Sequence, residues 1–396
     1  MKNVNEILAA IGVPGKNEDG SYTRTCLTPE YFESVRIAKE LMDNFGLQTE
    51  VNRIGTLHGV LPGSVPGLKS ILIGSHLDTV ISGGLFDGAF GVACGIEAAR
   101  RLKESGRKLR HPLEIYGFDC EESNPMGGTF GARCVAGNYD PQQLGLKESL
   151  ESFGLSLDDA NSCRRDFSDV KCYLEAHIEQ GDLLDNEHIT IGTVQGIVSI
   201  VRYVIDAIGQ SNHAGTTMMK NRHDAMVAMA RLISEADRRC REIDPALVLT
   251  FGTIECFPGA ENVIPGRVRC GVETRHMDIA VTDRMIDVIR EIAGSITTVK
   301  FDIRKKERKP GVTCDRHIMD LINASAKDAG ISFREMASGA GHDAVPIAKT
   351  GTPTAMIFVP SRGGLSHCGE EWTDPEDIAA GAEVVYRTLL KLDEED

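Results

Sequence analysis

Histidine and aspartate stand together after a short apolar segment, in G-S-H-L-D-T-V at residues 74–80. A histidine whose second ring nitrogen is fixed by a carboxylate is a frequent metal ligand. We therefore expect His76 to bind a metal ion and Asp78 to orient its imidazole. Asp87, in G-L-F-D-G-A at residues 84–89, could bridge two cations through its two oxygens. The alternative is a loop histidine among solvated aspartates.

A second polar cluster, D-C-E-E at residues 119–122, follows the apolar segment at residues 113–118. Adjacent carboxylates repel one another unless a cation or a shared proton relieves the repulsion. Because side chains alternate in direction, one of Glu121 and Glu122 can bind metal while the other faces the reacting water as general base. A solvated acidic turn is the alternative interpretation.

Two more histidines complete a candidate ligand set. His177 lies in Y-L-E-A-H-I-E-Q-G at residues 173–181, and His367 lies in G-G-L-S-H-C-G-E-E-W at residues 363–372. Three histidines and two carboxylates, one of them bridging, would form a binuclear site for Zn²⁺, Mn²⁺, Co²⁺ or Ni²⁺, which accept mixed nitrogen and oxygen ligands.

The elements that must position these residues alternate between buried-type strands and helices. Polar loops follow the strands, and sites in α/β sheets collect at the carboxyl ends of strands. The pattern predicts strands at 70–74, 113–118 and 354–359, and helices at 28–46, 89–105, 316–329 and 375–392.

The middle of the chain has a different order of elements. Strands are expected at 197–208, 247–256, 267–274 and 298–303, and helices at 224–241 and 279–292. The order β-α-β-β-α-β is that of a ferredoxin-like α+β domain. The basic run at residues 304–310 is expected to be a linker back to the first domain. The sequence thus predicts a smaller domain inserted into a discontinuous α/β domain.

Composition limits the classes of function. The chain has 396 residues with 43 Lys and Arg against 58 Asp and Glu, a formal charge of −15. Nucleic acids and anionic membranes call for clustered basic residues, so neither is an expected partner. The 11 cysteines form no C-x-x-C pair. The scattered cysteines predict a protein without a disulfide framework. Together with the lack of an apolar run at the N-terminus, they predict a cytoplasmic location.

Together, the motifs resemble the amidase, hydantoinase/carbamoylase group of the peptidase M20 superfamily. That group includes N-carbamoyl-L-amino acid hydrolases, allantoate amidohydrolases and metal-dependent β-ureidopropionases. The resemblance covers almost the whole chain. Besides the segments above, it rests on N-H-A-G-T-T-M-M-K-N-R-H-D-A at residues 212–225 and S-G-A-G-H-D-A at residues 338–344.

The resemblance implies two divalent metal ions per subunit, Zn²⁺ or Mn²⁺, with Co²⁺ or Ni²⁺ as further candidates. One ion would be bound by His76, Asp87 and His177, and the other by Asp87, Glu122 and His367. Glu121 would be the general base. It would take a proton from the attacking water and then protonate the leaving nitrogen.

The resemblance also implies substrate contacts from both domains. His213 would hydrogen-bond the substrate carbonyl and stabilise the developing oxyanion. Asn262 and Arg275 would hold the substrate carboxylate, since the Arg fork meets a carboxylate bidentately. Further contacts would come from Gln180, Gly341 and His342.

The fold that the resemblance implies is α/β. A mixed-sheet di-metal hydrolase domain at residues 1–196 and 310–396 would carry an inserted ferredoxin-like α+β lid and dimerisation domain at residues 197–309. The implied protein is a homodimer that cleaves the ureido C–N bond of a small carboxylate-bearing substrate. Some substrate contacts would cross the dimer interface.

Several alternatives remain at this point. The nearest are an allantoate amidohydrolase and, less favoured, an M20 dipeptidase or aminoacylase. A thiol amidase with Cys120 as nucleophile lacks a nearby cation to lower the thiol pKa. A metal-free binding protein would be expected to have lost a ligand or the base, and none is lost. Met218, and Cys368 with Gly369, depart from the residues usual in the group, so the substrate side group stays open.

Overall fold

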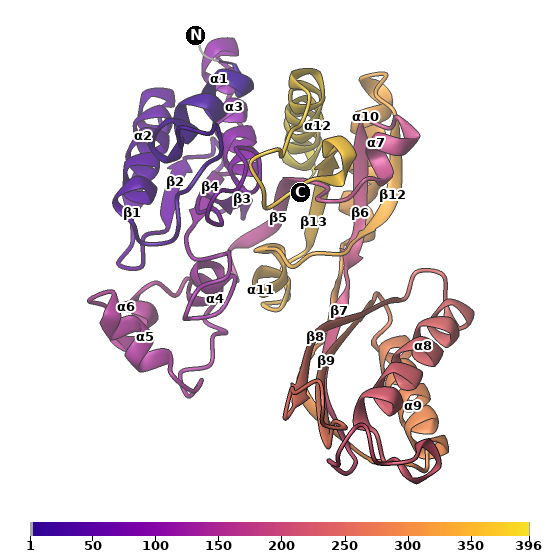
Figure 1. Cartoon of the computed structure of the whole chain (residues 1–396). Coiled ribbons are helices and arrows are strands. Elements are labelled where there is room, and N and C mark those ends of the chain that lie inside the picture. Colours follow the sequence, from indigo (N-terminus) through magenta and orange to yellow (C-terminus); the bar gives the residue numbers. More distant parts are fainter. Residues whose placement is uncertain (1–2, 396) are drawn as a thin grey trace. The chain divides into compact units, whose positions relative to one another are not determined.

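The computed structural model describes residues 3–395, which form two compact units. Unit 1 takes the chain up to Ile197 and again from Thr313 onward, and unit 2 is Val198–Val312. Figure 1 shows both units, coloured along the sequence. The chain therefore leaves unit 1 once, builds unit 2 and returns.

Unit 1 is built on a mixed sheet. Nine strands of the described residues follow the order β1-β2-β4-β3-β5-β13-β6-β11, with β12 paired to β6. Every residue of β3, β4 and β13 is buried, as in strands covered on both faces. The strands are β1 (Gln48–Val51), β2 (Leu57–Leu61), β3 (Ser70–His76), β4 (Leu113–Phe118), β5 (Val170–Ile178), β6 (Ile191–Ile197), β11 (Val312–Thr313), β12 (Phe333–Ser338) and β13 (Thr354–Val359).

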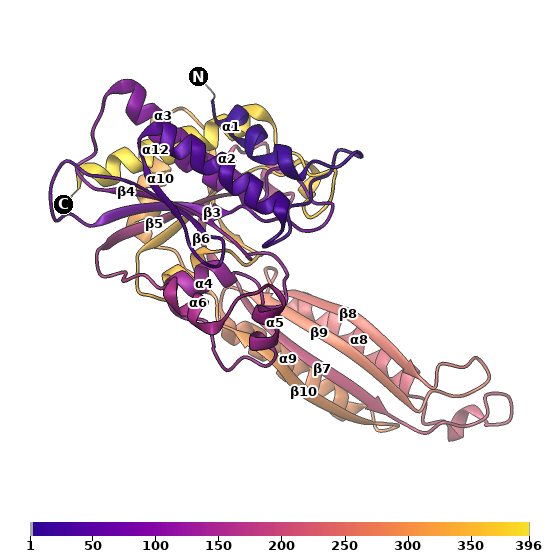
Figure 2. The ribbon, with the colours of Figure 1, turned by 90° about the vertical axis from the view of Figure 1, so that its left-hand side faces the viewer.

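Helices cover both faces of this sheet. In Figure 2, α1, α2, α3 and α12 lie on one side of it, and α4, α5 and α6 lie on the other. The bounds are α1 (Val4–Gly12), α2 (Pro29–Phe45), α3 (Ala89–Ser105), α4 (Phe130–Ala136), α5 (Leu146–Ser152), α6 (Leu157–Ser162), α7 (Leu183–Glu187), α10 (Arg316–Asp328), α11 (Ala344–Ala348) and α12 (Pro375–Glu394). Short 3₁₀ turns occupy Val13–Gly15 and Arg362–Gly364.

Local sequence explains where the predicted helices begin and end. The Thr28 hydroxyl accepts the Tyr31 N–H at the start of α2, and Pro29 takes the first helical position. Gly46 ends α2 in the left-handed conformation, which glycine adopts without strain. The described bounds of α3 coincide with the predicted ones.

Unit 2 is an antiparallel sheet in the order β10-β7-β9-β8. Its elements are β7 (Ser199–Ile208), a 3₁₀ turn (Met219–Asn221), α8 (Ala225–Ile243), β8 (Val248–Phe257), β9 (Arg267–His276), α9 (Ile279–Ser295) and β10 (Lys300–Lys309). Buried residues alternate along β7 and β9 and pack with Met229 of α8 and Ile289 of α9. The predicted α/β fold with a second, ferredoxin-like α+β part is confirmed.

The predicted linker at residues 304–310 is wrong. β10 continues to Lys309 and pairs with β7, with one irregularity between Lys305 and Glu307. The basic side chains have carboxylate partners: Arg304 pairs with Asp206, and Arg308 Nη2 lies 2.8 Å from Asp283 Oδ2. β10 is an edge strand, where exposed charged side chains are common. A run of basic residues is therefore compatible with either an edge strand or a linker, and the sequence did not distinguish them.

No helix within residues 3–395 has the length and apolar character needed to cross a membrane.

Candidate metal centre

The predicted ligands stand at the carboxyl ends of neighbouring strands. β3 is parallel to β4 on one side and to β5 on the other. His76 is the last residue of β3, and His177 is the penultimate residue of β5. Parallel strands end at the same edge of a sheet, so the topology brings the two histidines together. Glu121 and Glu122 follow the end of β4 at this edge.

Asp87 reaches the same place from the loop before α3. Gly88, the N-cap residue of α3, has φ +66° and packs against the His76 ring, where an added Cβ would lie 2.4 Å from ring atoms. Any side chain at residue 88 would therefore displace His76. The glycine lets the helix start, and the carboxylate just before it, approach the imidazole closely.

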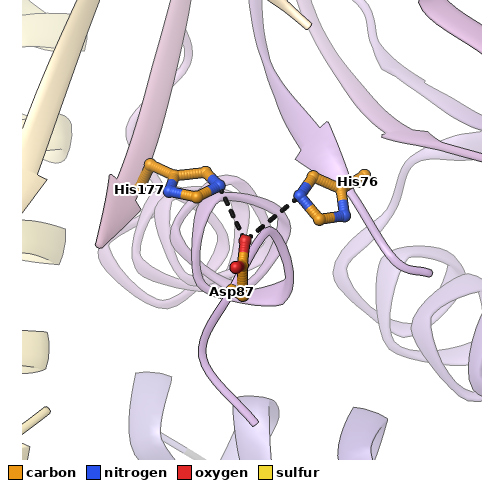
Figure 3. Close-up of side chains that lie close together, drawn as sticks. All are labelled: His76, Asp87 and His177. Atoms are coloured by element: carbon orange, nitrogen blue, oxygen red, sulfur yellow. Dashed lines mark ion pairs between the residues drawn. The ribbon is translucent and has the colours of Figure 1, made fainter. Parts of the chain in front are cut away.

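The first group of ligands consists of two imidazoles on one carboxylate oxygen. Asp87 Oδ1 lies 3.1 Å from His177 Nε2 and 3.4 Å from His76 Nε2. Figure 3 shows both rings pointing at this oxygen, with His76 coming from the end of β3 and His177 from β5. All three side chains are buried. Their ligand atoms lie within 4.8 Å of one another.

The second group of ligands uses the other carboxylate oxygen. Asp87 Oδ2 lies 3.3 Å from His367 Nε2, which is 3.5 Å from Glu122 Oε1. The ligand atoms of Asp87, Glu122 and His367 also lie within 4.8 Å of one another. His367 is half exposed, unlike the other two histidines. Asp87 thus presents one oxygen to each group, as a bridging carboxylate does.

The hydrogen bonds of the imidazoles fit a metal site. His76 Nδ1 lies 2.9 Å from the Asp78 carbonyl oxygen, and His177 Nδ1 lies 2.9 Å from that of Ile178. A carbonyl only accepts, so Nδ1 of each ring carries a proton and Nε2 is the nitrogen that faces Asp87. Each Nε2 must then hold either a second proton or a cation, because its lone pair would otherwise repel the carboxylate oxygen. The donor set and its outer hydrogen bonds therefore fit divalent metal ions.

The Asp78 side chain has a different geometry from the one expected. Its carbonyl, not its carboxylate, is the hydrogen-bond acceptor of His76, and carboxylate Oδ1 lies 3.7 Å from His76 Nδ1. The carboxylate instead accepts the backbone N–H groups of Glu121 at 3.2 Å and Glu122 at 3.1 Å. Asp78 therefore holds both the histidine and the acidic pair in place.

Glu121 lies beside the ligands but belongs to neither group. Its Oε2 is 3.9 Å from His76 Nε2, and its side chain is 13% exposed. Burial raises the pKa of the Glu121 carboxyl well above its usual value, against the opposing charge of His76. A carboxylate whose pKa is raised is a stronger proton acceptor, which suits a general base.

The buried acids and histidines shift the pKa values of one another. Burial acts to raise the pKa of Asp87, but His177, His367 and His76 hold it well below its usual value. Burial and the neighbouring Asp87 raise the pKa of Glu122 to about 7. A hydrogen bond to Asp87 raises the pKa of His367 to about 9, against burial. The histidine protons compensate the carboxylate charge here, a task that divalent cations can take over.

The predicted substrate residues of unit 1 lie around this cluster. Gln180 Nε2 donates to Asp87 Oδ2 at 2.9 Å, so the amide contacts the central carboxylate. His342 is buried, stacks edge-on against His177 with ring centroids 4.5 Å apart, and lies 2.8 Å from the Ser338 hydroxyl. Gly341 is exposed, with open space where a Cβ would stand.

The other predicted substrate residues belong to unit 2. His213 pairs with Val263 in a short bridge, and Ala214 N–H donates to the Asn262 carbonyl at 3.0 Å. The structure therefore brings the segments of His213 and Asn262 side by side. Arg275 lies near the end of β9, where its Nε donates to Glu273 at 2.6 Å.

The tautomer of His213 is fixed by its own loop. The backbone N–H groups of Gly215 and Thr216 donate to His213 Nδ1 at 3.0 and 3.2 Å. Nδ1 is therefore the acceptor of the ring, and in the neutral imidazole the proton resides on Nε2. His213 is exposed and offers this N–H as a hydrogen-bond donor.

Residues 72–391 match the sequence profile of peptidase family M20/M25/M40. The chain belongs to this family. Along the sequence, the M20 chain is 33% identical to the N-carbamoyl-L-amino-acid amidohydrolase of Pseudomonas sp. (strain NS671), over 96% of this chain and 95% of that protein. It is 34% identical to the allantoate amidohydrolase of Bacillus subtilis, over 96% of this chain and 94% of the relative.

Structural similarity gives the same family. A hydantoinase/carbamoylase family amidase from Burkholderia multivorans superposes with a TM-score of 0.90 at 29% identity, covering 99% of this chain and 97% of that one. The predicted membership of the M20 hydantoinase/carbamoylase group is confirmed. The protein is accordingly an amidohydrolase of the M20 family.

Sequence reasoning gave no role to one acid of this M20 site. Glu371 is buried and accepts the backbone N–H groups of Phe86 and Asp87 at 2.9 and 3.1 Å. It also accepts the Ser366 hydroxyl at 3.1 Å, and Ser366 contacts Asp87 Oδ2 at 3.0 Å. Glu371 therefore fixes the Asp87 loop to the loop that carries His367. The sequence feature that could have pointed to Glu371 is its position four residues after the predicted ligand His367.

Cys120 lacks the surroundings of a nucleophile. Its side chain is 1% exposed. Burial, with Cys26 and Asp119 nearby, raises the pKa of the Cys120 thiol well above its usual value. The thiolate is the reactive form, so these surroundings disfavour the thiol-amidase alternative.

Proposed function

We propose that this M20 amidohydrolase cleaves the ureido C–N bond of N-carbamoyl-L-amino acids or of closely related ureido acids. The observation that carries the proposal is the central carboxylate of Asp87, which presents one oxygen to each of two ligand groups. Two divalent cations per chain, Zn²⁺ or Mn²⁺, would fit these groups, with Co²⁺ and Ni²⁺ as alternatives. The relatives that act on N-carbamoyl amino acids and allantoate support the choice of bond.

Bound cations would supply Lewis-acid polarisation of the substrate carbonyl and would lower the pKa of the attacking water. Glu121 accepts a proton from that water while the water oxygen forms a bond to the ureido carbon. The C–N bond then breaks, and Glu121 returns the proton to the leaving nitrogen. Asp78 keeps Glu121 in position by accepting its backbone N–H.

His213 and Arg275 recognise the two ends of the substrate in this proposal. The Nε2–H group of His213 donates to the carbonyl oxygen, whose negative charge grows in the transition state. Arg275 and Asn262 bind the carboxylate. Glu273 orients Arg275 and is itself held by Arg202, whose Nε lies 2.5 Å from Glu273 Oε2.

The dimensions of unit 2 support a substrate site shared by two chains. Gly209 N–H bonds the Gly266 carbonyl, and Ile264 N–H bonds the Asn212 carbonyl. The segments of His213 and Asn262 therefore lie at the end of β9 where that strand begins. Arg275 lies eight residues further along the same strand. At about 3.4 Å per residue, roughly 25 Å separates the two ends, more than a small ureido acid can span. In a homodimer, His213 and Asn262 would therefore come from the partner of the chain that supplies Arg275.

Mixed dimers test the shared site. His213→Ala and Glu121→Gln are each inactive in the proposal, but a dimer of one with the other has one intact site. When equal amounts of the two variants reassociate at random, half of the dimers are mixed and each mixed dimer has one intact site of two. The mixture should therefore regain about one quarter of the wild-type activity per site. The two variants refolded separately are the control. If His213 served its own chain, the mixture would stay inactive.

Allantoate hydrolysis is the second candidate function, favoured by the B. subtilis relative. A substrate panel separates the candidates. Ammonia and amine release would be measured with N-carbamoyl-L-amino acids, N-carbamoyl-β-alanine, allantoate, N-acetyl amino acids and a dipeptide, each with Mn²⁺ and with Zn²⁺. The highest kcat/KM should fall on a ureido acid. Preference for the dipeptide or an N-acetyl amino acid would refute the proposal in favour of a dipeptidase or aminoacylase.

A further inference from the structure

A large cavity lies at the end of the unit 1 sheet away from the candidate metal centre. Its volume is about 1120 Å³, and it is lined by residues just before β3, β5 and β13. These strands run parallel, so their starts share one edge of the sheet and the metal ligands stand at the other. The seven residues of β3 at about 3.3 Å each place the cavity roughly 20 Å from His76.

The wall of the cavity is strongly basic, although the whole chain is acidic. Five cationic side chains line it, with Asp166 as the one lining carboxylate: Lys69, Arg164, Arg165, Lys171 and Lys349. The Asp166 carboxylate is itself bonded by the Ser168 backbone N–H and hydroxyl, at 2.9 and 2.8 Å. A hollow lined by one sign of charge concentrates counter-ions.

Two of these cations hold the framework of the cavity. Lys171 Nζ donates to the carbonyls of Leu392 and Glu395, at 2.8 and 2.6 Å. Arg165 Nη2 bonds Glu114 at 2.5 Å and lies 3.2 Å from Asp169 Oδ1. The charge of Arg165 is therefore already paired with carboxylates.

Two other cations stand exposed at the cavity. The side chains of Lys69 and Arg164 are exposed and make no hydrogen bond within residues 3–395, and Arg164 lies close enough to Asp166 for their charges to interact. Arg164 is nevertheless confined, because its aliphatic part lies over Gly137. A Cβ added to Gly137 would lie 2.7 Å from Arg164 Nε and 2.8 Å from Cδ. The glycine, at φ +67°, gives Arg164 room beside its backbone.

We propose that this cavity binds a small organic dianion, either a phosphate monoester or a dicarboxylate. Lys69 and Arg164 would neutralise the two charges of the ligand. Phe167, which packs under Arg165 at 5.6 Å from ring centroid to guanidinium carbon, gives the same wall an apolar surface for the body of the ligand. The site is separate from the metal centre and does not depend on the proposed reaction.

Calorimetric titration of the metal-loaded protein tests the proposal. The probes are sulfate, adenosine 5′-monophosphate and succinate, which chelate metals weakly, at constant ionic strength set with NaCl. At least one should bind, and tighter binding of the phosphate ester or of succinate identifies the preferred class. Lys69→Gln and Arg164→Gln should each weaken binding by about tenfold or more, a loss of about 1.4 kcal/mol.

Matched variants distinguish this site from general charge effects. Lys147→Gln and Arg241→Gln remove exposed cations outside the cavity wall and should leave binding unchanged. The proposal is overturned if no probe binds at about 10 mM, a concentration far above ordinary metabolite affinities. It is equally overturned if binding survives in the cavity variants but disappears in Asp87→Asn, because the anion would then occupy the metal centre.

Discussion

Replacement of Glu121 by glutamine isolates proton transfer from metal binding. Glutamine has the shape of glutamate but cannot accept the proton of the attacking water. The backbone N–H of residue 121 would still donate to Asp78, so the loop should keep its conformation. Neither candidate ligand group includes Glu121, so both groups remain complete in the variant.

The expected loss is large because Glu121 acts twice in the proposed reaction. Positioned general acid–base groups contribute about 10²–10⁴-fold to rates. Since the same carboxylate takes the proton and returns it, we expect the upper part of that range, about 10³–10⁴-fold in kcat. A loss of 10³-fold corresponds to about 4 kcal/mol of transition-state stabilisation. KM should change little, because Glu121 does not bind the ground-state substrate.

The assay is steady-state ammonia release together with metal analysis of the same samples. Glu370→Gln is the matched control, since Glu370 is exposed, follows the loop of His367 and should be dispensable. A Glu121→Gln protein that keeps its metal and more than about one tenth of wild-type kcat would refute the assignment of Glu121 as base. Loss of metal in that variant would instead mean that Glu121 is a ligand.

Three further substitutions test other parts of the structure. Arg275→Ala should raise KM for carboxylate substrates by about 30–100-fold, since charge-assisted hydrogen bonds contribute about 2–3 kcal/mol. Arg238→Ala, which removes an exposed arginine of α8, should leave KM unchanged. Asp87→Asn removes the carboxylate common to both ligand groups, so metal content should fall below one ion per chain, as measured by mass spectrometry. Burial acts to raise the pKa of Asp206, but Arg269 and Arg304 hold this pKa below its usual value. The ionised Asp206 therefore stabilises the folded protein above about pH 4, and this stabilisation is lost as the pH falls through the folded-state pKa. Asp206→Asn should therefore lower the free energy of urea unfolding by about 1–3 kcal/mol at pH 7 and by less near pH 3; an effect independent of pH would contradict the ion-pair explanation.

The ligand set was predictable because its signals are local. Each apolar strand is followed at once by polar residues, and parallel strands bring such residues to one edge of a sheet. Asp87 sits beside a glycine that opens a helix, a combination readable in G-L-F-D-G-A. These short patterns made His76 and Asp87 candidate ligands, whereas the grouping of His76, Asp87 and His177 around one ion came from the resemblance to the M20 group.

Features that depend on tertiary packing were not predictable. The role of Glu371 rests on backbone N–H groups more than 280 residues away in the chain, and no local pattern encodes such a contact. The carbonyl of Asp78, instead of its carboxylate, accepts from His76, and the carboxylate accepts the backbone N–H groups of Glu121 and Glu122. β10 was mistaken for a linker because the acids that pair with its basic residues, such as Asp206, lie on other elements.

The elements of unit 2 were predictable where burial alternates clearly along a strand. In β7 and β9 every second residue is buried, and the helices α8 and α9 carry one apolar face each, so the order of elements in unit 2 was legible. β8 lacks this contrast, since most of its residues are exposed, yet the strand predicted at 247–256 is present as Val248–Phe257.

Metal stoichiometry paired with activity tests the central claim most directly. The protein would be stripped with a chelator, titrated with Mn²⁺ or Zn²⁺, and followed by ammonia release from an N-carbamoyl-L-amino acid. The proposal predicts that activity is absent in the stripped protein and is complete at two ions per chain. Full activity in a metal-free protein, or no activity with a ureido acid at any metal loading, would contradict it.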